Sequence, residues 1–202
     1  MNYKKELFNE IEFHLLNDVK PSEYLCELLG NSAFKREHPF TYISNLTRVM
    51  QSPVHHPEGS VWNHTMLVVD NAAFIKNQSS DSRVFMWAAL LHDIGKSSTT
   101  RLRNNKLTAY DHDKVGAKQS VDFFKEFTED TEFITKVSNM IRWHMQLLYV
   151  VKNMPYAEIK NMKKDVTIND IALFGLCDRL GRGSPDKETE INNVKIFLSK
   201  TK

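Results

Sequence analysis

The feature that most constrains the fold is a helical spacing of apolar residues that runs through nearly the whole chain. Apolar residues recur every three or four positions, as at Leu7, Ile11 and Leu15, and only seven glycines and six prolines interrupt 202 residues. This period is typical of amphipathic helices packed around a shared core. The one clear break is TTRLRNNKLTAY at 99–110, whose two central asparagines indicate a turn. We therefore expect an all-α bundle with one short hairpin or loop.

Length and composition favour one domain with a sizeable core. A chain of 202 residues that is 41% hydrophobic can bury a continuous core, and no low-complexity linker divides it. We expect a single domain over 1–202. Within it we distinguish a helical N-terminal extension at 1–45, a core at 51–183 and a C-terminal helix at 187–199.

The cysteines, apolar runs and net charge bear on location and partners. Cys26 and Cys177 are the only cysteines, and each lies in an apolar stretch, which favours a reduced, cytoplasmic protein. No apolar run reaches the roughly 18 residues that would span a membrane. The N-terminus is typical of an amphipathic helix and not of an export signal. A net charge of +2 favours neither nucleic acid nor a membrane surface as a partner.

The most apolar segment, WAALLHDIGK, ends in an imidazole and a carboxylate, His92 and Asp93. In other segments, three more titratable residues share a helical face with apolar residues: His64, His144 and Asp178. Burying an unpaired charge is costly, so such groups must be paired or bound to a metal. Four separate segments that direct such groups inward favour one shared cause. A His/Asp set without thiolates suits Mn, Fe, Co, Ni or Mg better than structural zinc.

Each of these residues, taken singly, also has an ordinary structural explanation. A lone inward histidine is more often a hydrogen-bonded core residue than a metal ligand. The alternatives are a core position for His144, a helix end for His92 and Asp93, an ion pair with Arg142 or Arg179 for Asp178, and a helix N-terminal turn for His64.

Several motifs, separated along the chain, also occur in the same order as in a known family. The segments QSPVHHPEGSVWNHTMLVVDNAA, WAALLHDIGKSSTT, YDHDKVGA and CDRLGRG contain the pattern H…HD…D. This pattern resembles the HD-domain superfamily of metal-dependent phosphohydrolases, and within it the HD domain attached to bacterial CCA-adding tRNA nucleotidyltransferases. The resemblance extends from Gln51 to Gly183 and implies an all-α HD-domain helical bundle with 51–183 as its core. No glycine-rich strand-turn and no DxD motif of a nucleotidyltransferase head precede it, so we do not expect CCA addition.

The resemblance implies metal ligands at six positions. The ligands of a first ion are His64, His92, Asp93 and Asp178. Two further histidines, which hold a second ion in many HD proteins, are His112 and His144. The implied cofactor is a divalent metal ion, one or two per chain. Asp93 is well placed to bridge two ions.

The same resemblance assigns phosphate contacts. Lys96, in HDIGK, matches a lysine that contacts substrate phosphate in several branches, and it stands where HD monophosphatases that prefer deoxynucleotides carry glutamate. We expect catalytic roles for Asp93 and Lys96, and substrate binding by Lys96, Arg101 and Arg182. The alternatives are a solvated cation at a helix end for Lys96 and ordinary surface charge for the two arginines.

A further motif, HHPEG, lies just before the segment of His64. The resemblance implies that His56 and Glu58 orient ligands or line the entrance of the site. The alternative is that the segment is a turn made by Pro57 and Gly59.

The expected function is a metal-dependent phosphohydrolase, a phosphodiesterase or phosphatase, that acts on a nucleotide or another small phosphorylated substrate through metal-activated water. Resemblance to the tRNA enzymes implies 2′,3′-cyclic or 2′-phosphate nucleotides. The alternatives are a catalytically silent nucleotide-sensing module and an RNA-associated module. A degenerate sensor would be expected to lose one of the four first ligands. An RNA terminus as partner is not supported by the small net charge.

Overall fold

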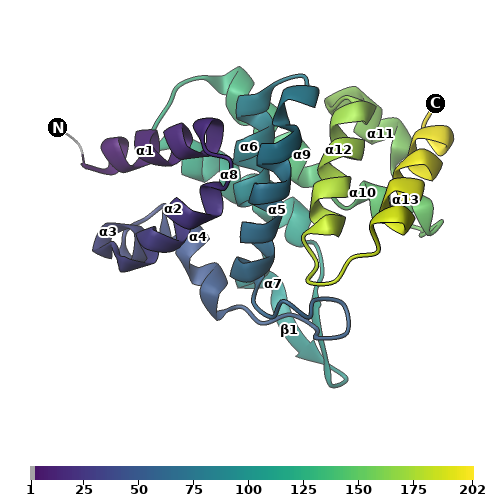
Figure 1. Cartoon of the computed structure of the whole chain (residues 1–202), viewed down its shortest axis with the longest axis horizontal. Helices are drawn as coiled ribbons and strands as arrows, with labels where there is room; N and C mark the ends of the chain where they lie inside the picture. Colours follow the sequence, from purple (N-terminus) through teal and green to yellow (C-terminus); the bar gives the residue numbers. More distant parts are fainter. Residues whose placement is uncertain (1–2) are drawn as a thin grey trace.

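Helices make up nearly all of the regular structure, and one two-stranded hairpin makes up the rest (Figure 1). The computed structural model describes residues 3–202. The predicted all-α bundle with a short hairpin is confirmed. The elements are α1 (Tyr3–Asn17), α2 (Pro21–Glu27), η1 (Leu28–Gly30), α3 (Ser32–Arg36), α4 (Thr41–Ser44), η2 (Asn45–Arg48), α5 (Val61–Ile75), η3 (Lys76–Gln78), α6 (Ser82–Leu91), α7 (Lys96–Thr99), β1 (Thr100–Arg103), β2 (Lys106–Ala109), α8 (His112–Lys125), α9 (Thr131–Trp143), α10 (Gln146–Val151), α11 (Ile159–Asp165), α12 (Ile168–Leu180) and α13 (Lys187–Lys200).

Polar caps fix where the two central helices begin. Ser60 precedes α5, and its side chain accepts a hydrogen bond from the backbone N of Asn63. Asp81 precedes α6 and accepts from the backbone N of Arg83 and Val84. A cap of this kind stabilises a helix by about 1 kcal/mol because it satisfies N–H groups that lack intrahelical partners.

The core surrounds α6, in which every residue after the first two is buried. Helices α5, α9 and α12 pack against α6, and α1 covers a further side (Figure 1). Phe8 of α1 stacks on Trp87 of α6 with ring centroids 4.9 Å apart. Buried apolar residues from Leu7 to Phe197 form one continuous cluster. Each large side chain so buried stabilises the fold by about 1.5–3 kcal/mol, which holds the C-terminal end of α6 in place.

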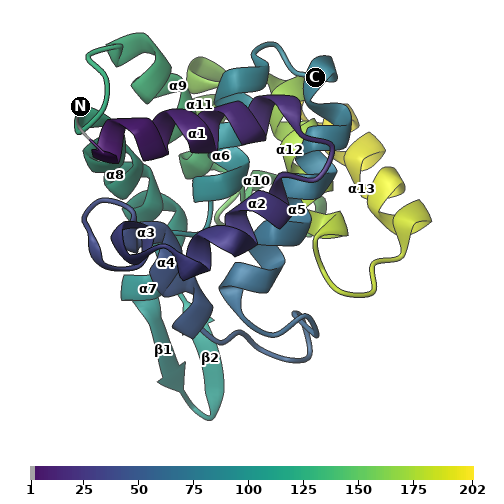
Figure 2. The same ribbon diagram turned by 60° about the vertical axis from the view of Figure 1, so that its left-hand side comes forward.

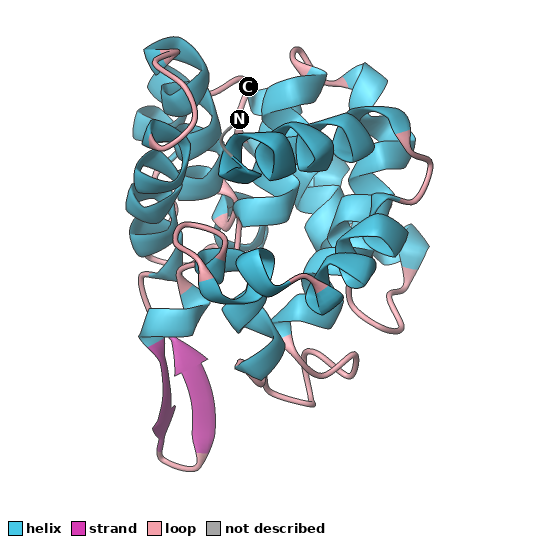
Figure 3. Cartoon of the chain, turned by 90° about the vertical axis from the view of Figure 1, so that its left-hand side faces the viewer, coloured by secondary structure: helices cyan, strands magenta, loops and turns pink. Residues whose placement is uncertain are grey.

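The hairpin consists of β1 and β2, which pair antiparallel with Thr100 opposite Ala109. Its turn residues, Asn104 and Asn105, have φ of 49° and 58°, a left-handed conformation that asparagine tolerates in two-residue hairpin turns. The predicted break at 99–110 is therefore a hairpin, and it projects from the helical body (Figures 2 and 3).

Side chains alternate between the two faces of this hairpin. Directly opposite residues share a face, so the register assigns every position. One face carries Thr100, Leu102, Leu107 and Ala109, and the other, which we call the cationic face, carries Arg101, Arg103, Lys106 and Thr108.

The predictions about membranes and thiols can be compared with the folded chain. Within residues 3–202, no helix is both long enough and apolar enough to cross a membrane. Cys26 is exposed and Cys177 is buried, and both are free thiols. A cytoplasmic location stays a prediction.

Candidate metal centre

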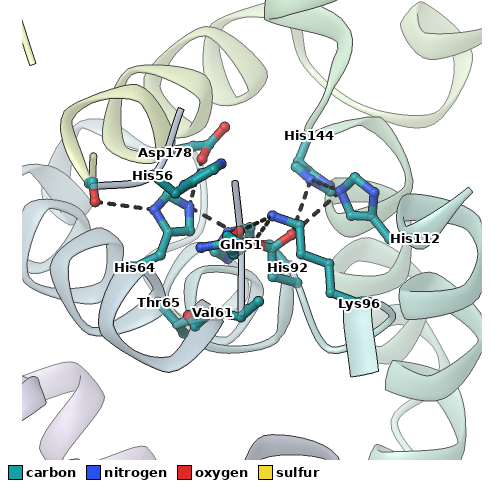
Figure 4. Close-up of polar contacts among 12 residues, drawn as sticks. Gln51, His56, Val61, His64, Thr65, His92, Lys96, His112, His144 and Asp178 are labelled. Carbon is teal, nitrogen blue, oxygen red and sulfur yellow. Dashed lines mark hydrogen bonds and ion pairs between the residues drawn. The ribbon is translucent and has the colours of Figure 1, made fainter. Parts of the chain in front are cut away.

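The six predicted ligands come from separate places in the chain and meet in its interior (Figure 4). They are His64 on α5, His92 and Asp93 just after α6, His112 at the start of α8, His144 just after α9, and Asp178 on α12. All six are buried. Five of the six supply ligand atoms to two groups in which the atoms lie within 4.8 Å of one another, His64–His92–Asp93 and Asp93–His112–His144, and Asp178 belongs to neither group. Asp93 belongs to both groups.

The segment that follows α6 crosses α8 closely, which places Asp93 near the first turn of α8. A Cβ at Gly95 would lie 2.2 Å from the carbonyl oxygen of His112 and 2.7 Å from the backbone N of Gly116, closer than real side chains approach. Glycine is therefore required where the chain leaving α6 touches the first turns of α8. The crossing leaves Nε2 of His112 3.4 Å from Oδ1 of Asp93.

Around His64, both ring nitrogens have partners. Nε2 lies 3.0 Å from Oδ1 of Asp178, and Nδ1 lies 3.1 Å from both the carbonyl of Gly181 and Oε1 of Glu58. Burial acts to lower the pKa of His64, but hydrogen bonds to Asp178 and Glu58 outweigh it and raise the pKa to about 9. Burial acts to raise the pKa of Asp178, yet the bond from His64 holds it well below its usual value. The charges of His64, Asp178 and Glu58 therefore compensate one another.

Around His112 and His144, the arrangement is different. Each ring donates its Nδ1 proton at 2.7 Å to a backbone carbonyl, that of Ala109 or of Ile141. With those protons on Nδ1, each neutral ring keeps a lone pair on Nε2, and the two Nε2 atoms face each other at 3.2 Å. Burial is the main reason that the pKa of each ring is lowered, that of His144 to about 3. Two converging lone pairs repel unless a proton or a cation lies with them.

His92 and Asp93 complete the set of buried donors. Nδ1 of His92 donates to the carbonyl of Ala89 at 2.9 Å, so its Nε2 also carries a lone pair. This Nε2 and Oδ1 of Asp93 are buried and make no hydrogen bond, whereas Oδ2 of Asp93 lies 2.8 Å from Nζ of Lys96. Burial acts to raise the pKa of Asp93, but electrostatic interactions with His92 and Lys96 outweigh it and hold the pKa well below its usual value, so the carboxylate stays ionised. Buried hydrogen-bond acceptors without a donor are rare in native proteins, and this set of electron-pair donors fits a divalent cation.

The region that contains most of these residues matches a known family. Residues 61–170, more than half of the chain, match the HD domain family. The chain belongs to this family. HD domains are generally hydrolases that bind divalent metals, and the buried histidines and aspartates of this HD domain could hold such an ion.

Similar proteins with curated descriptions are each named multifunctional CCA protein. That of Aromatoleum aromaticum is 37% identical over 84 residues, which cover 42% of this chain and 19% of that protein. That of Halorhodospira halophila is 44% identical over 57 residues, 28% of this chain and 13% of that protein. That of Methylococcus capsulatus is 38% identical over 84 residues, 42% of this chain and 18% of that protein. The matched region therefore spans less than a fifth of each of these relatives.

The HHPEG motif of the HD domain forms a support around His64. Oε1 of Glu58 lies 2.7 Å from Nδ1 of His56, and its Oε2 accepts from the backbone N of Gly183 at 3.0 Å. Burial opposes ionisation of Glu58, but hydrogen bonds from His64 and Gly183 lower its pKa to about 2. The segment is also a turn, with φ of +97° at Gly59. Glu58 thus ties the start of α5 to the chain that follows α12.

Lys96 lies over the centre and is held by a residue that sequence reasoning missed. Its Nζ is 2.8 Å from Oδ2 of Asp93 and donates to Oε1 of Gln51 at 2.8 Å (Figure 4). Gln51 is 45 positions earlier in the chain, and it lies in the QSPVHHPEG segment that carries the family resemblance. Lys96 is therefore a partly buried cation directed at the carboxylate, and not a solvated helix end.

A cavity of about 440 Å³ lies beside the centre and reaches Lys96, His56 and His112. Its lining contains four lysines or arginines and three histidines but neither aspartate nor glutamate. We call it the cationic cavity, and its four strong cations are Lys96, Lys152, Arg179 and Arg182.

Two of the three predicted substrate contacts, Lys96 and Arg182, line the cationic cavity, and Arg101 does not. Arg101 points to the cationic face of the hairpin, whereas Thr100, Leu107 and Ala109 of the opposite face line the cavity. Lys152, just after α10, was not singled out from the sequence because nothing in YVVKNMP distinguishes it from surface charge.

For Asp178, the expected ion pair forms, but the expected arginine partners are wrong. Neither proposed arginine pairs with it, because Arg142 pairs with Asp113 at 2.6 Å and Arg179 with Glu190 at 2.6 Å. The partner of Asp178 is His64, within the centre itself.

Proposed function

We propose that this HD domain is a phosphohydrolase that uses two divalent ions to cleave a small phosphorylated substrate, with a nucleotide phosphoester as the favoured class. The observation that carries the proposal is Asp93, a buried carboxylate shared by two groups of potential ligands, whose Oδ1 has no hydrogen-bond partner and whose Oδ2 is paired with Lys96. The first ion would be held by His64, His92, Asp93 and Asp178. The second would be held by Asp93, His112 and His144.

Bound divalent ions would supply an activated water and would offset negative charge that develops on the phosphoryl oxygens. The residues of the chain prepare the site for this chemistry. Backbone carbonyls fix the Nδ1 protons of His92, His112 and His144, so each ring presents an Nε2 lone pair. Glu58 and Gly181 fix the orientation of His64 in the same way.

The cationic cavity supports a phosphorylated substrate. Lys96 offers a point charge to a phosphoryl oxygen, and Gln51 holds that charge in place. Arg182 has a buried Nε with no hydrogen-bond partner, so it retains donor capacity toward an anion. The volume of about 440 Å³ is within the range of small-molecule sites.

The experiment is hydrolysis of three esters: 2′,3′-cyclic AMP, a generic aryl phosphodiester and an aryl phosphomonoester. Each would be assayed with Mn²⁺, Ni²⁺ or Co²⁺, with Asp93→Ala as the control. Turnover that Asp93→Ala abolishes is expected, and the preferred ester would define the branch of the family. Absence of turnover on every ester, in protein shown to contain metal, would instead favour a nucleotide-sensing module.

A further inference from the structure

A second cavity, of about 700 Å³, lies beside the end of β2 and is also lined by His112 of the centre. Thr108, Ala109 and His112 line both cavities. Because His112 is a proposed ligand of the second ion, a ligand could reach the centre from two directions.

The second cavity is rich in aromatic side chains. Tyr110, Tyr149 and Tyr156 line it, which is half of the six tyrosines in the chain, so we call it the tyrosine cavity. Tyr110 and Tyr156 are 63% and 60% exposed, so aromatic surface is accessible at this cavity. The rings of Tyr149 and Tyr156 are 5.6 Å apart and tilted by 58°, so they do not stack on each other. Because Tyr156 is largely exposed, its ring offers accessible surface to another planar group.

The charges of the tyrosine cavity, in contrast to those of the cationic cavity, are matched within it. Asp111 pairs with Lys114 at 2.8 Å, and Arg142 pairs with both Asp113 and Glu158, at 2.6 and 3.1 Å. Such an interior favours a neutral planar group over a phosphate.

The hairpin adds a positive rim to the tyrosine cavity. The guanidinium of Arg103 lies 4.8 Å from the ring centroid of Tyr110, and its Nη1 donates to Oγ1 of Thr108 at 2.7 Å. Arg101 and Lys106 lie on the same cationic face. Aromatic faces edged by cations are how proteins hold unpaired nucleotides, because every base has a face that stacks and a phosphate nearby.

We propose that the tyrosine cavity binds the base of a second nucleoside, so that the substrate is a phosphodiester between two nucleosides. This inference rests on the proposed function, which places the phosphate at the centre. A phosphodiester has two arms, and the two cavities that share His112 accommodate one arm each. The first nucleoside lies in the cationic cavity, and the base of the second stacks on Tyr156, beside Tyr149.

The test is equilibrium binding by calorimetry to chelator-treated protein, in which no turnover occurs. One ligand is the dinucleoside monophosphate adenylyl-adenosine. The matched ligand is adenosine 3′-(methyl phosphate), which has the same charge and first nucleoside but a methyl group as its second arm. We expect adenylyl-adenosine to bind about tenfold more tightly, the effect of stacking one base.

The variants are chosen to separate stacking from folding. Tyr156→Ala should remove the tenfold preference and leave affinity for the methyl diester unchanged, whereas Tyr156→Phe should retain the preference because it keeps the ring. Phe74→Ala is the matched control, since Phe74 is 87% exposed on α5 and lines neither cavity.

Two results would overturn the inference alone: equal binding of the two ligands to the wild type, or a preference that Tyr156→Ala leaves intact. Equal weakening of both ligands by Tyr156→Ala would also overturn it, because the tyrosine would then hold the first nucleoside. Failure of the metal-free wild type to bind either ligand would also overturn the inference, whereas the proposed function is tested separately by the hydrolysis assay with metal.

Discussion

The two halves of the buried centre satisfy their polar atoms in opposite ways. In the half built on His64, the ring lies between Asp178 and Glu58 and its pKa is raised to about 9. In the half built on His112 and His144, two lone pairs face each other and the pKa of each ring is lowered, mainly by burial. One half is thus stabilised by its own ion pairs, whereas the other is stabilised only when a cation is bound. The stability of the metal-free protein is therefore expected to depend more on His64 than on His144.

The largest effect should come from the residue common to both halves. Asp93→Ala removes the carboxylate shared by both groups, so we expect loss of both ions and a fall in phosphohydrolase activity on the order of 10³-fold or more. Elemental analysis and a hydrolysis assay check this. Asp165→Ala is a control, because Asp165 is an acidic residue outside both groups. Retention of two ions by Asp93→Ala would show that the two groups do not share it.

The next effect concerns the stability of the metal-free protein. His64→Ala leaves Asp178 and Glu58 without their shared partner, and we expect it to lower the free energy of unfolding by about 3–5 kcal/mol. His144→Ala leaves a cavity but relieves the contact between two lone pairs, so its cost should be only about 1–2 kcal/mol. Denaturant unfolding in the presence of a chelator measures both. Equal losses would contradict the difference between the halves.

These predictions also show how far the sequence alone could lead. Apolar spacing and the HD dipeptide were enough to predict the all-α fold and to direct His64, His92, His144 and Asp178 inward. The paired asparagines indicated the hairpin. For a helix, a period of 3.6 decides which side chains face the core, so these inferences need only local pattern.

Other features depend on contacts between distant parts of the chain. The face on which Arg101 lies follows from strand register, which shifts every side chain to the opposite face when it slips by one residue. Gln51 and Lys96 are 45 positions apart, and their contact has no local signal. Lys152 lines the cationic cavity only because α10 and the hairpin border the same cavity. Tertiary placement, and not composition, decides these cases.

Adding metal back to the protein should test the difference between the two halves of the centre. At a hundred times its dissociation constant, one bound ion stabilises a protein by about 2.7 kcal/mol. We expect wild-type protein to bind two ions per chain and His144→Ala to bind one, because the His64–His92–Asp93 group stays intact. Thermal unfolding with and without metal, together with metal content after dialysis, provides the measurement. Two ions in His144→Ala would place the second ion elsewhere.

The smallest predicted effect distinguishes the cationic cavity from the cationic face of the hairpin as the place where phosphate binds. Lys96→Met removes a cation from the cationic cavity and should weaken binding of a small phosphorylated ligand such as adenosine 3′-(methyl phosphate) by about tenfold. Arg101→Ala removes the same charge from the cationic face and should change this affinity by less than about twofold. Calorimetric titration of both variants checks the difference. If Arg101→Ala weakens binding more than Lys96→Met does, the phosphate binds at the cationic face, which would contradict our account.

The most direct test of the central claim is anomalous diffraction from crystals soaked with Mn²⁺. The account predicts two anomalous peaks, one on each side of the Asp93 carboxylate, the first bordered by His64, His92 and Asp178 and the second by His112 and His144. It is contradicted if no peak lies within bonding distance of Asp93 while manganese is present elsewhere in the crystal.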